Sequence, residues 1–322
     1  MSLEKRIKKT RTIKEISLKT YIRNLNNLYE IVEDGEDFDS LTWLLDYEKI
    51  YDYLETLTTT TKKNYYTAIL VALSTNPKIS AQVKDLYEDD LNMSADEYME
   101  EMKTQKLTPK QEKNWVRLSI LQEIVKKRGV DATKLLEKPD WNTRDFQKFQ
   151  LYIIGLLYTE IEPMRNDYAD MKVITKMEWS KLSSKDKSEG DLNYIVVDKD
   201  GDFHFNINTY KTDKTYGERY LPVEPNSTLS NAISLWLERN KTGWFLITRD
   251  RRPLNPNVLT KAINRVFEPD TGKKISSTLL RHIYLSERYV ADYDQKRQDA
   301  YKMGHSINTQ QNIYVKHVPD HI

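Results

Sequence analysis

The sequence has no cysteine among its 322 residues. Disulfides, thiol catalysis and zinc–thiolate sites are therefore excluded, and an intracellular location is expected. Long apolar runs are missing as well, because the longest, LYIIGLLY from Leu151, is far too short to cross a bilayer. The first residues, MSLEKRIKKTRTIKE, are basic and lack the apolar run of a signal peptide. We therefore expect no membrane partner.

A large net charge is also missing, since 50 Lys and Arg residues balance 49 Asp and Glu residues to give +1. This balance weakens a nucleic-acid interpretation but does not exclude it, because phosphates respond to a local patch. The charges are segregated: residues 1–30 and 239–288 are basic, whereas 34–55 and 85–101 are acidic. Solvated helix faces are the default explanation of such runs. The same pattern would also suit a two-lobed clamp around a polyanion.

Helical periodicity dominates the first hundred residues. Apolar residues recur at spacings of three or four in 16–32, 41–57 and 58–76. The segment LTPKQEKNW then opens a new helix, with Thr108 as N-cap, Pro109 in the first turn and Gln111 completing a capping box. We therefore expect a helical domain in residues 1–104 and a second domain in residues 105–322.

The second domain changes character after Arg165. Residues 193–223 alternate in polarity, are rich in β-branched and aromatic residues, and contain two turn signals, Asp200-Gly201 and TDKTYG. This pattern predicts a three-stranded antiparallel meander, and helical periodicity returns from Thr228 onward. The expected fold class is mainly α with a small antiparallel sheet (α+β).

Five side chains of the second domain suggest a common chemistry. In chain order they are Arg165, Lys211, Arg281, His305 and Tyr314. Each also has an ordinary explanation.

The two arginines could pair with Asp167 and Glu287, and His305 could cap the following helix. Tyr314 could cover core, and Lys214 is a rival to Lys211.

The order of these residue types resembles that of the tyrosine recombinase and type IB topoisomerase superfamily. LTPKQEKNW is similar to the opening of its catalytic domain, MRNDYADM to the turn with its first arginine, and LLRHIYLSE to the helix with its second. MGHSINTQQNIYV resembles the run that leads to its nucleophile, while SLKTYIRNLNNL and TTTTKKNYYTAILVAL resemble its helical core-binding domain. The resemblance covers nearly the whole chain. It implies a DNA core-binding domain in 1–104 and a mixed α/β catalytic domain in 105–322.

The resemblance also implies roles for the five side chains. Tyr314 would attack a DNA phosphodiester and form a 3′-phosphotyrosine, which needs neither a cofactor nor a metal ion. Arg165 and Arg281 would hold the non-bridging oxygens, because a guanidinium binds two oxygens at once and stays charged. Lys211 would protonate the departing 5′-oxygen, and His305 would donate to a phosphate oxygen.

The sequence departs from the family pattern at Thr278, where many recombinases have a histidine. A hydroxyl at Thr278, or at the neighbouring Ser277, could still donate to the phosphate, but it cannot titrate near neutral pH. We therefore add Thr278 to the candidate catalytic residues.

The expected partner is double-stranded DNA, bound by a homo-oligomer (a dimer or a tetramer). Site-specific recombination or integration is the favoured function, in the manner of enzymes encoded by viruses and mobile elements, which would place the protein in host cytoplasm, nucleus or virion. A type IB topoisomerase, a DNA-binding protein that has lost catalysis and a helical scaffold are the alternatives. The candidate DNA-binding residues are Lys8, Lys9, Arg11, Lys62, Lys63, Lys214, Arg251, Arg252 and Lys261.

Overall fold

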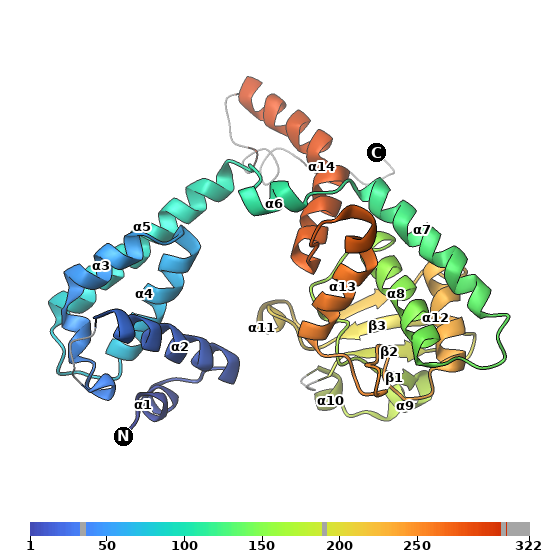
Figure 1. Ribbon diagram of the computed structural model, residues 1–322, viewed down its shortest axis with the longest axis horizontal. Coiled ribbons are helices and arrows are strands. Elements are labelled where there is room, and N and C mark those ends of the chain that lie inside the picture. The colour runs from blue at the N-terminus through green and yellow to red at the C-terminus, as the bar shows by residue number, and fades with distance from the viewer. Residues whose placement is uncertain (33–36, 189–191, 304–306, 308–322) are drawn as a thin grey trace, which may run out of the picture. The chain divides into compact units, whose positions relative to one another are not determined.

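The computed structural model describes residues 1–32, 37–188, 192–303 and 307 (Figure 1). The chain divides into two compact units, Met1–Leu107 and Thr108–Ile322. The division falls close to the boundary expected from the sequence, between residues 104 and 105. The prediction of a mainly helical chain with a small sheet is confirmed.

The first unit is built from helices around one apolar core. Its largest fully buried side chains are Trp43, Tyr66 and Tyr87, and the Tyr87 hydroxyl donates to the Leu44 carbonyl at 2.9 Å. Its helices are α1 (Leu3–Thr10), α2 (Glu15–Val32), α3 (Tyr47–Glu55), α4 (Thr59–Leu73) and α5 (Ala81–Lys103), with short 3-10 turns at Phe38–Ser40 and Thr42–Leu45.

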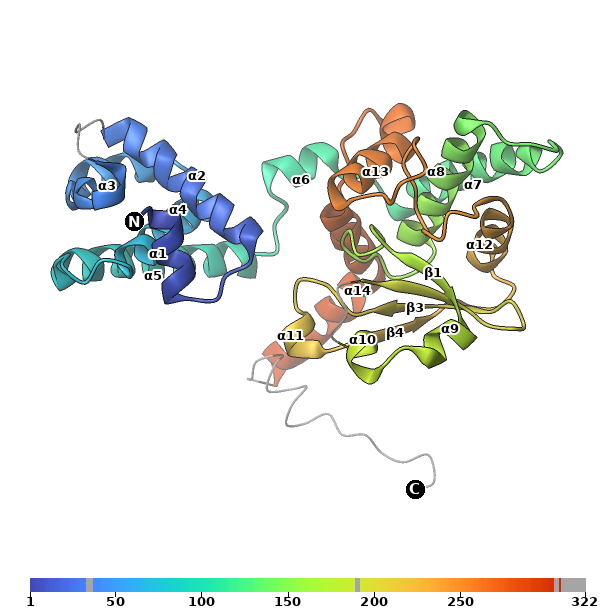
Figure 2. The same cartoon turned by 90° about the horizontal axis from the view of Figure 1, so that it is seen from below.

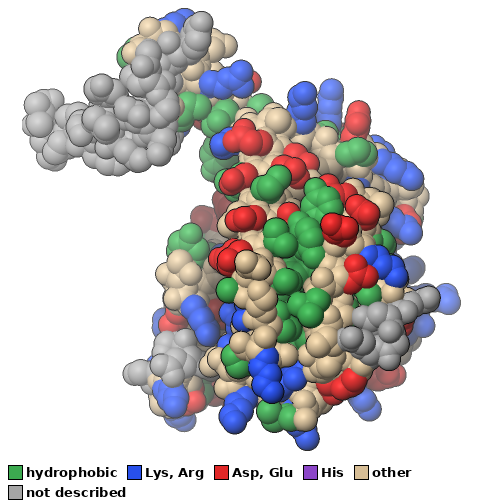
Figure 3. Space-filling model, turned by 90° about the vertical axis from the view of Figure 1, so that its left-hand side faces the viewer, with side chains coloured by type: hydrophobic (Ala, Val, Ile, Leu, Met, Phe, Trp, Pro, Cys, Tyr) green, Lys and Arg blue, Asp and Glu red, His purple; other side chains and the backbone are tan. Residues whose placement is uncertain are grey.

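The acidic segment around residues 85–101 belongs to the long helix α5, which leaves Leu86, Met93 and Met99 exposed. On the face of this unit that Figure 3 turns toward the viewer, Asp and Glu side chains surround exposed hydrophobic ones. The acidic run is therefore a solvated helix surface, which is its default interpretation.

The second unit contains a four-stranded sheet in the order β1-β2-β3-β4. Strands β2 (Tyr194–Val197), β3 (Phe203–Ile207) and β4 (Arg219–Pro222) form the antiparallel meander that the sequence predicts. The predicted three-stranded sheet is incomplete, however, because β1 (Lys172–Thr175) pairs in parallel with β2. Four residues show too little alternation to reveal a strand, and the pairing of β1 depends on residues distant in sequence. The sheet is therefore mixed.

Helices cover both faces of this sheet. In Figure 2, α7, α8, α12 and α13 lie on one face, and α9 and α10 lie on the other. The helices of this unit are α6 (Pro109–Asn114), α7 (Leu118–Leu135), α8 (Thr143–Thr159), α9 (Lys176–Lys181), α10 (Ser184–Ser188), α11 (Asp213–Tyr216), α12 (Thr228–Arg239), α13 (Pro256–Thr271) and α14 (Ser277–Lys302).

The apolar run LYIIGLLY forms the second half of α8, which lies in the core of the unit. Ile153, Ile154 and Leu157 are fully buried there, and Phe149 stacks on Trp236 of α12 at 6.3 Å between ring centroids. Among the helices that the structure describes, none has the length and hydropathy needed to cross a membrane. Helix α8 is thus a core helix, and the turn that follows it is attached to this buried helix.

The capping box predicted at Thr108 is confirmed. The Thr108 hydroxyl accepts from the Gln111 amide at 3.3 Å, and the Gln111 side chain accepts from the Thr108 amide at 2.8 Å. Both bonds satisfy backbone donors that the first turn of a helix otherwise leaves unpaired. The helical segment of the second unit therefore begins at Pro109, as expected.

Helices α7 and α8 approach so closely at Gly155 that no side chain fits. A Cβ atom there would lie 2.6 Å from a Val125 methyl group. Gly155→Ala should lower the free energy of unfolding by about 1–3 kcal/mol, because overpacking outweighs the gain in helix propensity. Chemical denaturation measures this change.

Gly129→Ala is the matched control, since its Cβ would meet only the ring tip of half-buried Tyr152, at 2.9 Å. The ring can move, so this variant should be as stable as the wild type or more so. Equal stability of the two alanine variants would contradict the proposed close approach of α7 and α8 at Gly155.

Candidate active site

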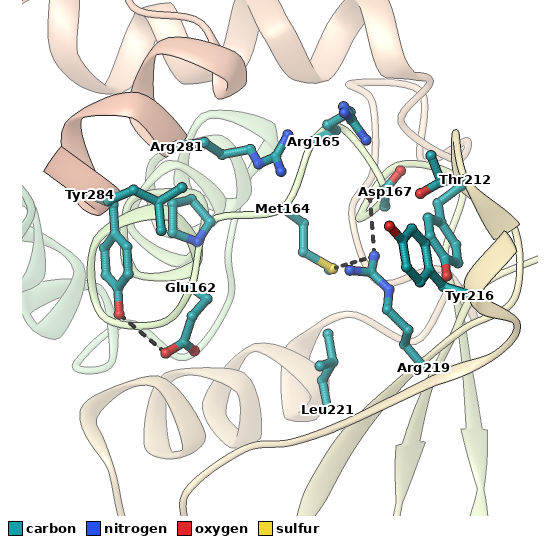
Figure 4. Close-up of a pocket in the computed structure, with 13 residues that line it drawn as sticks. Glu162, Met164, Arg165, Asp167, Thr212, Tyr216, Arg219, Leu221, Arg281 and Tyr284 are labelled. Carbon is teal, nitrogen blue, oxygen red and sulfur yellow. Dashed lines mark hydrogen bonds and ion pairs between the residues drawn. The ribbon is translucent and has the colours of Figure 1, made fainter. Parts of the chain in front are cut away.

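A pocket of about 460 Å³ opens in the second unit where three segments meet. The turn after α8 contributes Glu162, Met164, Arg165 and Asp167; the β3–β4 connection and β4 contribute Tyr210, Tyr216 and Arg219; and α14 contributes Arg281 and Tyr284 (Figure 4). Two of the predicted catalytic residues, Arg165 and Arg281, therefore line one pocket although they are far apart in the sequence.

Arg165 is held by the backbone of a turn that rests on the core. The buried Tyr158 of α8 donates its hydroxyl to the Arg165 carbonyl at 2.6 Å, and the preceding Met164 is buried. This arrangement fixes the turn and leaves the Arg165 side chain half-buried at the pocket. The MRNDY segment is thus an anchored turn.

Arg281 reaches the same pocket from the second turn of α14. Burial, together with the positive charge of Arg165, lowers the pKa of Arg281 below its usual value. Figure 4 shows the two side chains at the same edge of the pocket. Two like charges at one edge repel each other, so this placement raises the electrostatic free energy unless an anion binds between them.

The ordinary explanation for these arginines was an ion pair with Asp167 or Glu287. Glu287 instead accepts a hydrogen bond from the Leu118 amide at 2.8 Å, at the start of α7, and Asp167 pairs with Arg219. Within the described part of the chain, neither Arg165 nor Arg281 has a side-chain hydrogen bond or an ion pair. Their donors therefore remain available to a ligand.

Arg219 is a third arginine of the pocket and was not predicted from the sequence. Its guanidinium lies 3.8 Å from Asp167 Oδ2, stacks 4.1 Å above the Tyr210 ring and contacts the Met164 sulfur at 3.8 Å. The Arg219 Nε is buried and has no hydrogen-bond partner among the described residues. The segment ERYLPV indicates only a strand, and two of the residues around Arg219, Met164 and Asp167, lie more than fifty positions earlier. No local signal could have revealed it.

Asp167 is a carboxylate that interacts with all three of these cations. Burial raises the pKa of the Asp167 carboxyl above its usual value, although the charges of Arg219, Arg165 and Arg281 act to lower it. At the rim of the pocket, Glu162 pairs with Arg288 at 3.5 Å and accepts from the Tyr284 hydroxyl at 3.2 Å. Three arginines thus face one half-buried carboxylate. This excess of positive charge suits an anion with several oxygens, such as a phosphate.

Both candidate lysines lie on the connection between β3 and β4. Lys211 is exposed and stands between Tyr210 and Thr212, which both line the pocket. Lys214 is exposed on α11, two residues before the pocket residue Tyr216. The connection therefore brings both lysines to the border of the pocket, and Lys211 and Lys214 both remain candidates.

Thr278 lies one turn before Arg281 on α14, and its side chain is exposed without lining the pocket. It does not cap the helix, because Ser276 accepts from the Leu279 amide at 3.2 Å. Ser277 is buried at 6% exposure, which makes it the weaker of the two hydroxyl candidates. The remaining predicted residues, His305 and Tyr314, lie outside the described residues.

The predicted DNA-binding residues differ in their availability. Lys9, Arg11, Lys214, Arg252 and Lys261 are exposed. Lys8 is also exposed but pairs with Glu4 and Glu15, at 3.0 and 3.1 Å.

Two further candidates lie against aromatic rings, since Lys63 packs over Tyr98 at 4.8 Å and Arg251 over Phe146 at 4.4 Å. The prediction for Lys62 is wrong. This side chain is 7% exposed and pairs with Glu55 at 3.0 Å and Glu97 at 3.6 Å, so its charge is neutralised inside the first unit.

Comparison of the chain with protein-family models, with curated proteins and with solved structures finds no match. The function must therefore be inferred from the chemistry of the pocket and from the residues around it.

If the pocket binds an anion, sulfate should raise the melting temperature of the wild-type protein, because a ligand of the native state stabilises that state. Arg281→Ala should lose most of this shift, since it removes one of the two guanidinium groups that have no ion pair with a described residue. Thermal unfolding at increasing sulfate, with sodium chloride at matched ionic strength, measures the effect.

Arg252→Ala provides the control, because Arg252 is exposed and lies outside the pocket. It should keep the wild-type response, including the general stabilisation that sulfate gives any protein. An identical sulfate response in Arg281→Ala and Arg252→Ala would show that the pocket binds no sulfate.

Proposed function

We propose that the protein cuts and rejoins DNA through a covalent 3′-phosphotyrosine and that it acts as a site-specific recombinase. The observation that carries this proposal is the meeting of Arg165 and Arg281 in one pocket, where neither side chain has an ion pair or a hydrogen bond with another described residue. Two fixed guanidinium groups are what a phosphodiester requires when negative charge builds up on its non-bridging oxygens. The motif order along the chain supplies the remaining residues of the proposed reaction.

The proposed first step is attack by the Tyr314 hydroxyl on the phosphorus. The bond from the tyrosine oxygen to phosphorus forms, the bond from phosphorus to the 5′-oxygen breaks, and the phenolic proton is lost to water. The Lys211 ammonium gives its proton to the departing 5′-oxygen. His305 and Thr278 would donate hydrogen bonds to phosphate oxygens. The energy of the bond is kept in the phosphotyrosine, so the reverse attack by a 5′-hydroxyl rejoins a strand without ATP or a metal.

The two-unit organisation supports binding of duplex DNA. Exposed cations are present in both units, with Lys9 and Arg11 in the first and Arg252 and Lys261 in the second. Such side chains neutralise backbone phosphates whatever the base sequence. Recombination joins two duplexes, so a dimer or a tetramer on DNA is part of the proposal.

Tyr314→Phe should bind DNA normally and form no covalent adduct, because only the hydroxyl oxygen is removed. The measurement uses a nicked suicide duplex, whose cut end diffuses away, followed by a denaturing gel. An undiminished adduct would transfer the nucleophile to another tyrosine, with Tyr301 the next candidate. Recombination of paired sites by the wild type supports a recombinase, whereas relaxation of supercoiled DNA by single protomers would indicate a type IB topoisomerase.

Arg165→Ala and Arg281→Ala should slow cleavage far more than they weaken DNA binding. Removing one donor to the transition state costs on the order of 3 kcal/mol, or about a hundredfold in rate. Single-turnover cleavage and equilibrium binding on the same duplex separate the two effects. Arg252→Ala, outside the pocket, should change binding and leave the cleavage rate of bound DNA unaltered. Parallel losses of binding and cleavage in the pocket variants would make Arg165 and Arg281 general DNA contacts.

A further inference from the structure

One buried side chain joins the turn that carries Arg165 to the loop that carries Lys211. Asn193, directly before β2, is 6% exposed. Its Nδ2 donates to the Asp167 carbonyl at 2.9 Å and to the Thr209 carbonyl at 3.1 Å. Its Oδ1 accepts from the amides of Asn208 at 3.0 Å and Thr209 at 2.9 Å. All four hydrogen-bonding positions of this amide are used.

The two segments that Asn193 joins are both next to the candidate chemistry. The Asp167 carbonyl is two residues after Arg165, and Thr209 is two residues before Lys211. The backbone of Asn193 also accepts from the Lys172 amide at 2.9 Å, which ties β1 to the same point. Because Asn193 is buried and fully bonded, it holds its partners in one arrangement.

The loop beyond Thr209 is closed by a second contact. Tyr210, 7% exposed, donates its hydroxyl to the Gly217 carbonyl at 2.8 Å, so residues 210–217 form a closed loop that contains both candidate lysines. Gly217 adopts a φ of +67°, which a side chain would strain. Asn193 fixes the start of this loop at Thr209, and the Tyr210 hydroxyl holds its two ends together.

We propose that Asn193 is the positioning residue that sets the lysine-bearing loop against the turn of Arg165, and this inference rests on the proposed function. Protonation of the leaving 5′-oxygen requires the Lys211 ammonium to reach it while the phosphate is held by the arginines. A displacement of about 1 Å between such groups can cost a hundredfold in rate. The role of Asn193 is therefore to hold Lys211, the general acid, at the correct distance from Arg165 and Arg281.

The test compares two leaving groups. A duplex with sulfur in place of the bridging 5′-oxygen releases a thiolate, which needs no proton because a thiol has a pKa of about 8.5. Asn193→Ala should cleave the normal duplex on the order of a hundredfold more slowly than wild type. It should cleave the sulfur duplex at the wild-type rate. Lys211→Ala should show the same pattern, and Arg281→Ala should be slow on both duplexes.

Asn240→Ala is the matched control. Asn240 is also buried, at 4% exposure, and its side chain binds the Trp244 carbonyl at 2.7 Å and the Thr242 hydroxyl at 2.8 Å. None of these three residues lines the pocket. Asn240→Ala should destabilise the protein, because it leaves buried hydrogen-bonding partners unsatisfied. It should leave the rates at which the folded protein cleaves the two duplexes unchanged.

The outcomes separate this inference from the proposed function. Equal slowing of Asn193→Ala on both duplexes, or a wild-type rate on both, would overturn the positioning role while strand cleavage itself stands. Absence of any adduct with the wild-type protein would overturn the proposed function and the role of Asn193 with it. Should the alanine variant not fold, Asn193→Ser retains a hydroxyl donor and acceptor and is held to the same comparison of the two duplexes.

Discussion

The rest of the site depends on two like charges that the fold forces together. Arg165 and Arg281 come from a turn and a helix more than a hundred residues apart, and the pKa of Arg281 is lowered by burial and by the charge of Arg165. Their repulsion must be outweighed by the packing that fixes each backbone, namely the Tyr158 hydroxyl bond to the turn and the buried first turns of α14. A site that keeps this repulsion in the free protein is ready for an anion, because binding relieves it.

The residues around the two arginines have two roles: one balances their charge, and the other fixes the position of the backbone segments. Asp167 offsets part of the positive charge and, through Arg219, links the turn to β4. Asn193 links the same turn to the start of the loop between β3 and β4. These contacts come from one ion pair and one buried amide, so the relative position of turn and loop does not depend on exposed side chains. In the proposed reaction, this arrangement would let Arg165 and a lysine of the loop act on a single phosphate.

A feature could be predicted from the sequence when the residues that determine it are neighbours in the chain. The capping box at Thr108 and the turn at Gly201 are local, and both are present in the structure. Arg165 and Arg281 were chosen through their motifs, and both line one pocket. By contrast, β1, Arg219 and Asn193 were missed, because their roles arise from partners distant in the chain. Lys62 was misjudged for another reason, since its pairing with Glu55, seven residues away, and with Glu97 appears only when the helices pack.

The central claim is that the arginine pocket serves a covalent reaction of DNA at Tyr314. The most direct measurement is tandem mass spectrometry of the protein after incubation with a suicide duplex and digestion of both protein and DNA. We expect one peptide that carries a nucleotide on the Tyr314 oxygen through a 3′-phosphate. A nucleotide on another residue, or unmodified peptides under conditions where the duplex is bound, would contradict it.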